Sequence, residues 1–220
     1  MVSIHPRIKV CCIANEKEAA DAISFGASAI GLVGKMPSGP GPISDEEIFR
    51  IARTVPPPIA TFLLTSEQTA QGIIDHHHRT RTNTIQIVDG LNDRAYAEIR
   101  EALPNVKLVQ VIHVVGDESV DEAYELAEHV DAILLDSGNP KLAVKELGGT
   151  GRRHDWRLSR KIVEICGKPV FLAGGLNAEN VREAIETVQP FGLDLCSGVR
   201  TNGILDLFKL EAFFAAVEGT

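Results

Sequence analysis

Short apolar runs alternate with longer segments of helical periodicity along the chain. Each run has the length of a buried strand, and each is followed by apolar positions spaced three and four residues apart. The predicted strands are residues 8–13, 29–33, 59–64, 84–88, 106–114, 131–135, 169–173 and 191–196. The predicted helices are residues 16–25, 44–54, 67–77, 93–102, 119–129, 156–165, 179–188 and 205–217.

Polar residues mark the start of several predicted helices. Asn15 with Glu18, and Ser44 with Glu47, have the spacing of a capping box, in which two side chains satisfy free N–H groups of the first turn. Asp155 precedes Trp156 as a further N-cap. These positions therefore predict where three of the helices begin.

Eight consecutive strand–helix units predict a parallel sheet, and eight such strands close into a (β/α)8 TIM barrel of the α/β class. The alternative is an open, doubly wound sheet, which usually has five or six strands. No Gly-x-Gly-x-x-Gly follows the first strand, which further disfavours a dinucleotide-binding fold. No linker or low-complexity tract divides the chain, so residues 1–220 are expected to form one domain.

The charge balance limits the partners. Asp and Glu number 30 against 22 Lys and Arg, giving a formal net charge of −8. Nucleic-acid binding requires clustered cations, so it is disfavoured. The short basic segment at residues 76–81 is expected to be a solvated helix end. No apolar run approaches the roughly 20 residues needed to span a bilayer, so no membrane partner is expected.

The chain has four cysteines, Cys11, Cys12, Cys166 and Cys196. None has zinc-ligand spacing, and no metal constellation stands out. Few cysteines and no apolar signal core predict a reducing, cytoplasmic location.

Candidate catalytic residues stand where the predicted strands end, because barrels of this kind place their active sites at the C-terminal ends of the strands. Side-chain alternation along the first strand points Lys9 and Cys11 into the barrel and leaves Cys12 among the residues facing the helices. A cysteine beside a lysine can serve as a thiolate base or nucleophile, although it can equally be a small buried apolar residue. Asp136 ends the sixth strand and could act as an acid or bond to loop backbone.

Three glycine-containing turns follow late strands, at 148–151, 174–177 and 197–198. Glycine lets backbone N–H groups approach an anion closely, and barrels commonly bind phosphate after the seventh and eighth strands. The turns therefore predict a phosphate site, against the alternative of ordinary turn glycines. The isolated histidines His113, His129 and His154 are expected to be structural.

These residues resemble phosphoribosylanthranilate isomerase over nearly the whole chain. The resemblance rests on segments 9–11, 13–15, 26–33, 134–136, 148–151, 155–156, 172–177, 180–181, and Asp194 followed by 197–199. It implies an Amadori rearrangement without cofactor or metal, with Cys11 as general base and Asp136 as general acid. It further implies that Gly174, Gly175, Ser197 and Gly198 hold the substrate phosphate. The other candidate substrate-site residues are Lys9, Gln86, Gly149, Asp194 and Arg200.

Several positions depart from the family pattern. Cys12 stands where the family usually has glycine, and Gly41 stands where it has an arginine that meets the anthranilate. The fourth strand ends without the usual histidine, at Val88 and Asp89, and Arg200 replaces a glutamate. Losing a buried partner of a carboxylate costs roughly 2–5 kcal/mol, which Arg200 or Lys35 could offset by supplying another cation.

Three functions fit this pattern. The chain could be an isomerase of this type, a related isomerase for another phosphorylated sugar, or a non-catalytic barrel that binds a phosphorylated ligand. The substrate is in each case a small phosphorylated molecule. Residues 34–43 and 137–155 are the natural lid loops. Both a monomer and a homodimer are compatible with the sequence.

Overall fold

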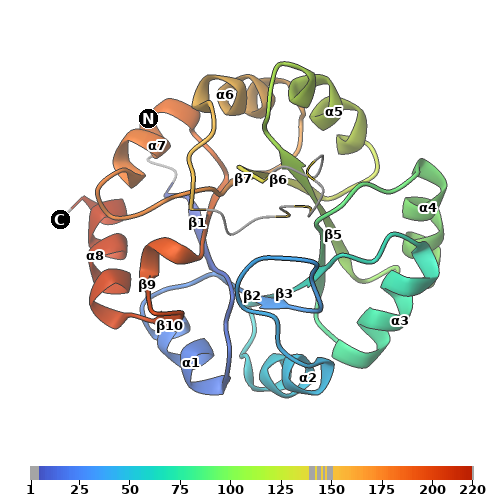
Figure 1. Cartoon of the computed structure of the whole chain (residues 1–220), viewed down its shortest axis with the longest axis horizontal. Coiled ribbons are helices and arrows are strands. Elements are labelled where there is room, and N and C mark those ends of the chain that lie inside the picture. Colours follow the sequence, from blue (N-terminus) through green and yellow to red (C-terminus); the bar gives the residue numbers. More distant parts are fainter. Residues whose placement is uncertain (1–4, 139–141, 143–144, 146, 148–150, 220) are drawn as a thin grey trace.

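Eight parallel strands close into a barrel, with helices around it (Figure 1). The computed structural model describes residues 5–138, 142, 145, 147 and 151–219. The strands are β1 (Arg7–Val10), β2 (Ala29–Val33), β3 (Ala60–Thr65), β4 (Thr84–Ile87), β5 (Lys107–His113), β6 (Ala132–Asp136), β7 (Val170–Leu172) and β8 (Gly192–Leu195). The helices are α1 (Glu16–Ser24), α2 (Asp45–Thr54), α3 (Ala70–Thr80), α4 (Asp93–Ala102), α5 (Glu118–Ala127), α6 (Trp156–Ile165), α7 (Val181–Val188) and α8 (Leu207–Glu218). The predicted (β/α)8 barrel is confirmed, and among the described residues no helix is long and apolar enough to cross a membrane.

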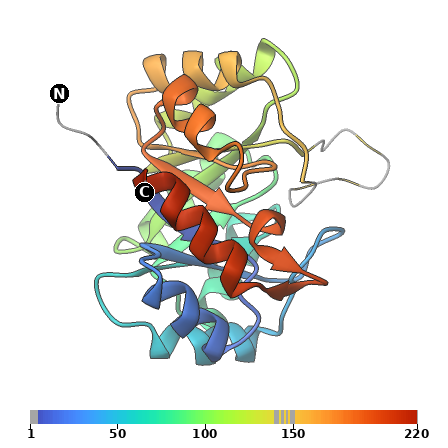
Figure 2. The ribbon, with the colours of Figure 1, turned by 90° about the vertical axis from the view of Figure 1, so that its left-hand side faces the viewer.

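The barrel closes where the first strand meets the last. β1 pairs in parallel with both β2 and β8, so that Lys9 lies opposite Ala29 on one side and Asp194 on the other. The side view shows β8 and helix α8 crossing the molecule together (Figure 2). The closure brings residues that are about 185 positions apart in sequence into direct contact at the β1–β8 seam.

Alternating side chains of the strands form two apolar layers. The outer layer lies between the strands and the helices, and Leu63 and Ile85 belong to it. The inner layer fills the barrel and includes Phe62, Leu64 and Val111. Because parallel strands covered by helices are buried on both faces, they appear in the sequence as continuous apolar runs.

Most helix boundaries agree with the sequence prediction because capping side chains set them. Glu18 N–H donates to the Asn15 side chain at 2.9 Å, and Glu47 N–H donates to Ser44 Oγ at 3.2 Å. The prediction for the third helix was wrong at its start, since α3 begins at Ala70 and not at residue 67. The Thr69 side chain accepts from Gly72 N–H at 3.1 Å, and this cap determines the start.

The segment after β8 differs from the prediction of a single helix from residue 205. It contains a short 3-10 turn, Ser197–Val199, then the hairpin of β9 (Arg200–Thr201) and β10 (Ile204–Leu205), before α8 begins. Two-residue strands carry too little periodicity to be read from sequence.

The expectation that the basic segment 76–81 is a solvated helix end was wrong in part. His78, Arg79 and Arg81 are exposed, but His76 and His77 are both buried. His76 bonds Thr65 Oγ1 at 2.9 Å and Asp45 at 3.1 Å, and His77 bonds the Thr82 carbonyl at 2.8 Å. Burial lowers the pKa of both rings, so they pack as neutral side chains.

Candidate active site

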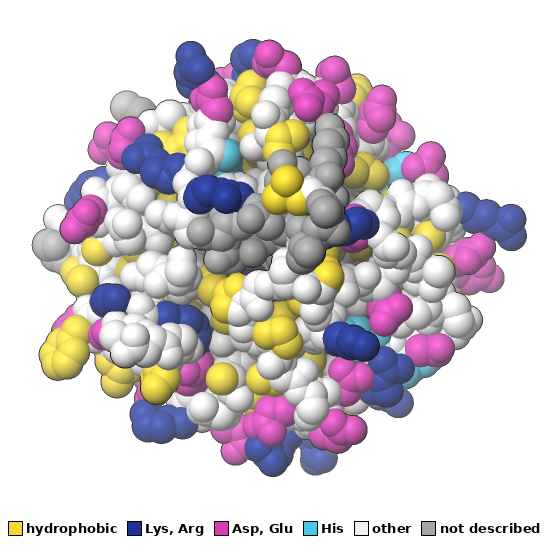
Figure 3. Space-filling model, in the orientation of Figure 1, with side chains coloured by type: hydrophobic (Ala, Val, Ile, Leu, Met, Phe, Trp, Pro, Cys, Tyr) yellow, Lys and Arg dark blue, Asp and Glu magenta, His cyan; other side chains and the backbone are white. Residues whose placement is uncertain are grey.

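A pocket opens at the C-terminal ends of the barrel strands, where the glycine turns and the catalytic candidates were expected. Charged side chains surround the margin of this face, and apolar ones gather nearer its centre (Figure 3). The described residues that line the pocket include most of the sequence-predicted candidates, namely Cys11, Gln86, Asp136, Gly174, Gly175, Asp194 and Ser197. Gly149 lies outside the described residues. Parallel strands bring these side chains together because all their C-terminal ends meet at one rim.

Cys11 and Cys12 follow directly after β1 and both face the pocket. Cys11 is 5% exposed and Cys12 is 6% exposed. The prediction that Cys12 faces the helices was wrong. The strand ends at Val10, and Cys12 adopts φ 61°, a left-handed conformation that interrupts the alternation. Glycine adopts this conformation without a steric penalty, which gives a physical reason for the glycine usual in the family at this position.

Lys9 and Asp194 form a buried ion pair next to the pocket. Lys9 Nζ lies 2.8 Å from Asp194 Oδ1, and the two side chains are 0% and 8% exposed. Burial lowers the pKa of Lys9, but the Asp194 and Cys11 charges more than offset it, so the pKa lies above its usual value. Lys9 is therefore a permanent cation inside the barrel, and among the pair only Asp194 lines the pocket.

The surroundings of Cys11 favour its thiolate. A hydrogen bond from Cys12 is the largest cause holding the pKa of Cys11 below its usual value, and the Lys9 charge acts in the same direction against the effect of burial. The same bond, together with one to Cys196, raises the pKa of Cys12 well above its usual value. Cys12 thus remains a thiol that donates, while Cys11 is the sulfur prepared to accept a proton.

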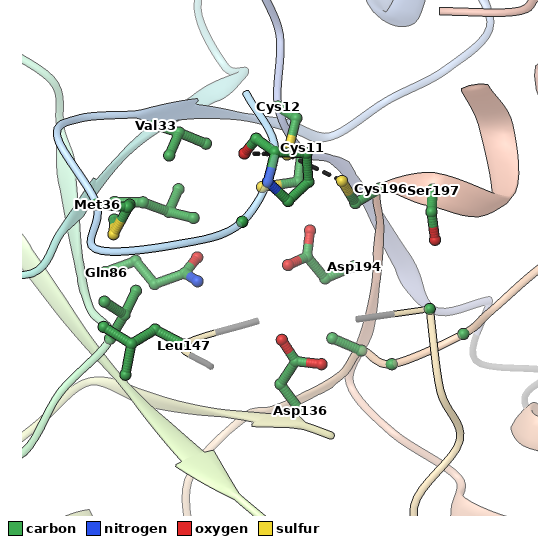
Figure 4. A pocket seen from close by; sticks show the side chains of 18 of the residues that line it. Cys11, Cys12, Val33, Met36, Gln86, Asp136, Leu147, Asp194, Cys196 and Ser197 are labelled. Carbon is green, nitrogen blue, oxygen red and sulfur yellow. Dashed lines mark hydrogen bonds between the residues drawn. The ribbon is translucent and has the colours of Figure 1, made fainter. Parts of the chain in front are cut away.

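Asp136 ends β6 on the opposite side of the pocket from Cys11, with Asp194 between them (Figure 4). Its side chain is 9% exposed. Asp136 Oδ1 accepts from Ser137 N–H at 2.7 Å, which fixes the carboxyl group at the rim. Asp136 therefore bonds to loop backbone and also lines the pocket, so the two roles considered from the sequence are compatible.

Gly151, the turn at Gly174 and Gly175, and Ser197 converge on one corner of the pocket. Gly174 and Gly175 have φ values of 85° and 65°, conformations that L side chains rarely adopt. A Cβ at Gly175 would lie 2.8 Å from the Gly151 carbonyl oxygen, and a Cβ at Gly151 would lie 3.3 Å from Ser197 Oγ. Glycine at these positions allows the loops after β6, β7 and β8 to meet and present backbone to one ligand group.

Gly198 does not line the pocket, and it contributes by close packing. A Cβ there would collide with the Leu176 carbonyl oxygen, so glycine allows the turn after β8 to pack directly on the turn after β7. Asn180 holds the second turn, since its Nδ2 donates to the Gly175 carbonyl at 2.9 Å and its Oδ1 accepts from Asn177 N–H at 3.0 Å.

Arg200 lies outside the pocket, which corrects its assignment as a substrate-site candidate. Arg200 Nη2 lies 2.9 Å from Glu18 Oε2, and the same nitrogen donates to the Cys12 carbonyl at 2.6 Å. The side chains of Arg200 and Glu18 are 6% and 10% exposed. The guanidinium group is therefore committed to joining the segment after β8 to helix α1 and to the end of β1.

Much of the remaining wall of the pocket is apolar, and the sequence did not identify it as part of the site. This apolar part includes Val33, Met36, Leu64, Val88 and Leu147. Gln86 points from β4 toward the open centre, and its Oε1 is buried with no hydrogen-bond partner among the described residues. An unpartnered buried amide costs free energy unless a ligand satisfies it. Alternation of side chains along β3 could have indicated Leu64, whereas Met36 and Leu147 lie on loops.

Comparisons with known proteins agree with this geometry. The sequence model of the N-(5'-phosphoribosyl)anthranilate (PRA) isomerase family matches residues 8–216. N-(5'-phosphoribosyl)anthranilate isomerase 2 from Methanosarcina mazei is 37% identical over 209 residues, which cover 94% of this chain and 92% of that protein.

Two solved structures share the fold over the full length. Phosphoribosyl anthranilate isomerase from Thermotoga maritima superposes with a TM-score of 0.83 at 28% identity, covering 98% of this chain and 100% of that one. A phosphoribosyl anthranilate isomerase in complex with reduced 1-(o-carboxyphenylamino)-1-deoxyribulose 5-phosphate gives 0.80 at 26% identity, with the same coverage. From the match of the family model and the relatives, the chain belongs to the N-(5'-phosphoribosyl)anthranilate isomerase family.

Proposed function

We propose that this chain converts N-(5'-phosphoribosyl)anthranilate to carboxyphenylamino-deoxyribulose phosphate, the Amadori step of tryptophan biosynthesis, with Cys11 as general base and Asp136 as general acid. The observation that carries the proposal is the placement of these two groups on opposite sides of one pocket, beside the corner where Gly151 meets the turns after β7 and β8.

The two side chains match the two proton transfers of the reaction. Asp136 protonates the ribose ring oxygen as the C1–O bond breaks, and the anthranilate nitrogen forms a double bond to C1. Cys11 then removes the proton from C2, and the resulting enol tautomerises to the ketone. General acid and base groups in these roles typically contribute 10²–10⁴-fold each.

Lys9 and Asp194 act as positioning residues for the base. Lys9 lies close to Cys11 beside Gly31, because a Cβ on that glycine would be 2.7 Å from Cys11 Sγ and 3.0 Å from Lys9 Nζ. The ammonium group favours the thiolate, and Asp194 holds the ammonium in place at 2.8 Å.

The substrate phosphate fits the corner formed by Gly151, Gly174, Gly175 and Ser197. Backbone N–H groups in turns with positive φ form concave donors for anions. The Gly198 backbone supports this corner by packing against Leu176. The related protein whose complex contains a deoxyribulose 5-phosphate supports a ligand of this class.

The anthranilate ring fits the apolar wall, and its polar groups fit Gln86. An ortho amine and carboxylate place a donor and an acceptor side by side, and a primary amide offers the complementary pair. Gln86 Oε1, which has no partner among the described residues, would accept from the amine N–H, while Nε2 would donate to the carboxylate. Gln86 thereby supplies part of the recognition that Gly41 cannot supply.

A cytoplasmic location is part of the same proposal. All four cysteines are free thiols, as is usual for proteins of a reducing compartment.

The decisive experiment measures turnover of freshly generated N-(5'-phosphoribosyl)anthranilate by the decrease of its fluorescence. The wild-type chain and Cys166→Ala should turn over, and Cys11→Ala should not. Cys166 is a buried cysteine away from the pocket, so it controls for the loss of a thiol. A folded wild-type protein without turnover would refute the proposal.

A further inference from the structure

Two thiols at the rim of the pocket lie in contact, and neither transfers a proton in the proposed reaction. Cys12 Sγ and Cys196 Sγ are 2.9 Å apart (Figure 4). Cys12 follows the end of β1 and Cys196 follows the end of β8, so the contact bridges the seam where the barrel closes. Cys166 follows helix α6 and lies away from this pair, and its thiol donates to the Lys168 carbonyl.

The backbone already holds the two cysteines in position for a covalent link. Val10 pairs with Leu195, and Cys11 N–H donates to the Leu195 carbonyl at 2.7 Å, which fixes the register just before both residues. A disulfide has an S–S distance of about 2.05 Å. The sulfur atoms at 2.9 Å therefore need to approach by about 0.9 Å, which small side-chain rotations can supply.

Both thiols can be reached from the pocket. Cys12 and Cys196 line it, and Cys196 is partly exposed. The Arg200 guanidinium lies close behind, where Nη2 donates to the Cys12 carbonyl at 2.6 Å. Peroxides react with the thiolate form of a cysteine.

We propose that Cys12 and Cys196 are a redox-active thiol pair, which a peroxide oxidises to a disulfide at the rim of the active site. The sulfur of Cys196, the more exposed of the two, attacks one peroxide oxygen as it loses its proton and becomes a sulfenic acid, while the other oxygen leaves as water after protonation. The Cys12 sulfur then attacks the sulfenic sulfur, the S–S bond forms, and a second water leaves. Two thiols lose two electrons and two protons in total, and one hydrogen peroxide is reduced to two waters.

The link also changes the surroundings of the proposed base. The reduced Cys12 thiol is the largest cause of the low pKa of Cys11, and its Sγ lies 3.6 Å from the Pro40 carbonyl oxygen. A disulfide sulfur has no proton to donate, so the linked Cys12 can no longer favour the thiolate of Cys11 in this way. This consequence rests on the proposed function, whereas formation of the disulfide does not.

The experiment treats the reduced full-length protein with hydrogen peroxide at increasing molar ratios and quenches free thiols with iodoacetamide. The expected result is an intact mass lower by two hydrogens, with two thiols fewer available for alkylation. Trypsin should release a peptide spanning residues 10–17 joined to one spanning 183–200, and dithiothreitol should separate them. Turnover of N-(5'-phosphoribosyl)anthranilate should fall at least tenfold and return after reduction.

Four variants identify the partners. Cys11 and Cys12 lie on the same tryptic peptide, so the link must vanish in Cys12→Ser and persist in Cys11→Ser. Cys196→Ser should abolish the link, and Cys166→Ser should leave both the link and the basal activity unchanged.

A Cys11–Cys12 link, or oxidation of Cys11 to sulfinic acid with no cross-link, would overturn the proposal. A reduced protein that never turns over the substrate refutes the isomerase function alone, because the mass measurement decides the disulfide independently.

Discussion

Cys12 occupies the space that a side chain at position 41 would need. A Cβ on Gly41 would lie 2.7 Å from Cys12 Cβ and 3.0 Å from its Sγ. Both residues have positive φ, 61° at Cys12 and 84° at Gly41. The Cys12 side chain therefore fills space that a side chain at position 41 would need. The two departures from the family pattern in this part of the chain are thus sterically coupled.

This coupling predicts non-additive effects in a double-mutant cycle. Gly41→Arg alone should lower both the melting temperature and kcat/KM, because its Cβ collides with Cys12. Adding Cys12→Gly should recover much of the loss by removing the obstacle, with a coupling energy on the order of 0.5–3 kcal/mol. Thermal unfolding and steady-state kinetics of the wild type, the two single variants and the double variant measure this coupling energy. Strictly additive effects would show that the two positions do not compete for space.

Removing the proposed base should affect catalysis and leave folding intact. Cys11→Ser keeps the size and burial of the side chain but replaces a thiol by a hydroxyl that does not ionise near neutral pH. We expect kcat to fall by roughly 10²–10⁴-fold, with KM changed little. Cys166→Ser is the matched control elsewhere in the barrel, and a variant at position 11 with wild-type kcat would exclude Cys11 as the base.

Replacing Lys9 should shift the titration of Cys11. Lys9→Met removes the cation that helps to lower the pKa of the thiol, so this pKa should rise, and the acid limb of the kcat/KM profile should move to higher pH. The rate of alkylation of Cys11 by iodoacetamide against pH, measured in a Cys12→Ser, Cys166→Ser and Cys196→Ser background, reports the pKa directly. An unchanged alkylation profile would mean that Lys9 supports the fold and not the base.

The Glu18–Arg200 pair should be important for stability. Glu18→Gln leaves the Arg200 charge buried without its partner, a loss of about 3 kcal/mol or more in the free energy of unfolding. Asp21→Asn on the same helix is the control, because its pair with the exposed Lys17 contributes less than about 1 kcal/mol. Urea unfolding of the two variants compares them, and equal losses would contradict the assignment.

The same pair predicts a pH dependence. Burial raises the pKa of Glu18, but bonds from Arg200 and from backbone N–H groups more than offset it, so the pKa lies below its usual value in the folded state. The stabilisation is thus complete above the unfolded pKa of about 4.3 and is lost as the pH falls through the folded value. Glu18→Gln should remove this part of the acid sensitivity.

His154 should contribute a second, higher window of acid sensitivity. Burial lowers its pKa to about 4, while its Nε2 bonds Ser159 Oγ at 2.7 Å. A folded pKa below the unfolded value of about 6.5 means that stability is complete above pH 6.5 and is lost as the pH falls toward 4. The loss from this ring is on the order of 3 kcal/mol. Melting temperatures between pH 7 and 4 should fall less steeply for His154→Gln than for the exposed control His78→Gln, and equal slopes would contradict this role.

The catalytic candidates could be found from sequence because, in a barrel, residues that end successive strands lie close together. The period of the apolar runs predicted eight parallel strands, and their C-terminal ends must share one rim. Cys11, Asp136 and Gly174 were therefore placed near one another before any contact was known. The helix caps at Asn15 and Ser44 were equally accessible, since a cap depends on residues three positions apart.

The direction of Cys12 and the partner of Arg200 could not be found in this way. Alternation assumes extended backbone, and Cys12 departs from it with φ 61°. From sequence alone, Arg200 could have been a cation that binds substrate. In the folded chain it instead pairs with Glu18, which is 182 positions away in sequence. Nothing local distinguishes a guanidinium group that meets a ligand from one that meets a helix.

The sequence by itself determined the barrel, the rim and the residue types that stand on it, because periodicity, caps and turn glycines act over a few neighbouring positions. Only the tertiary structure decided which sulfur faces which, since the contact of Cys12 with Cys196 arises when β1 and β8 close the barrel. Closure brings together groups separated by almost the whole chain, and their mutual distances depend on the packing of all the strands between them.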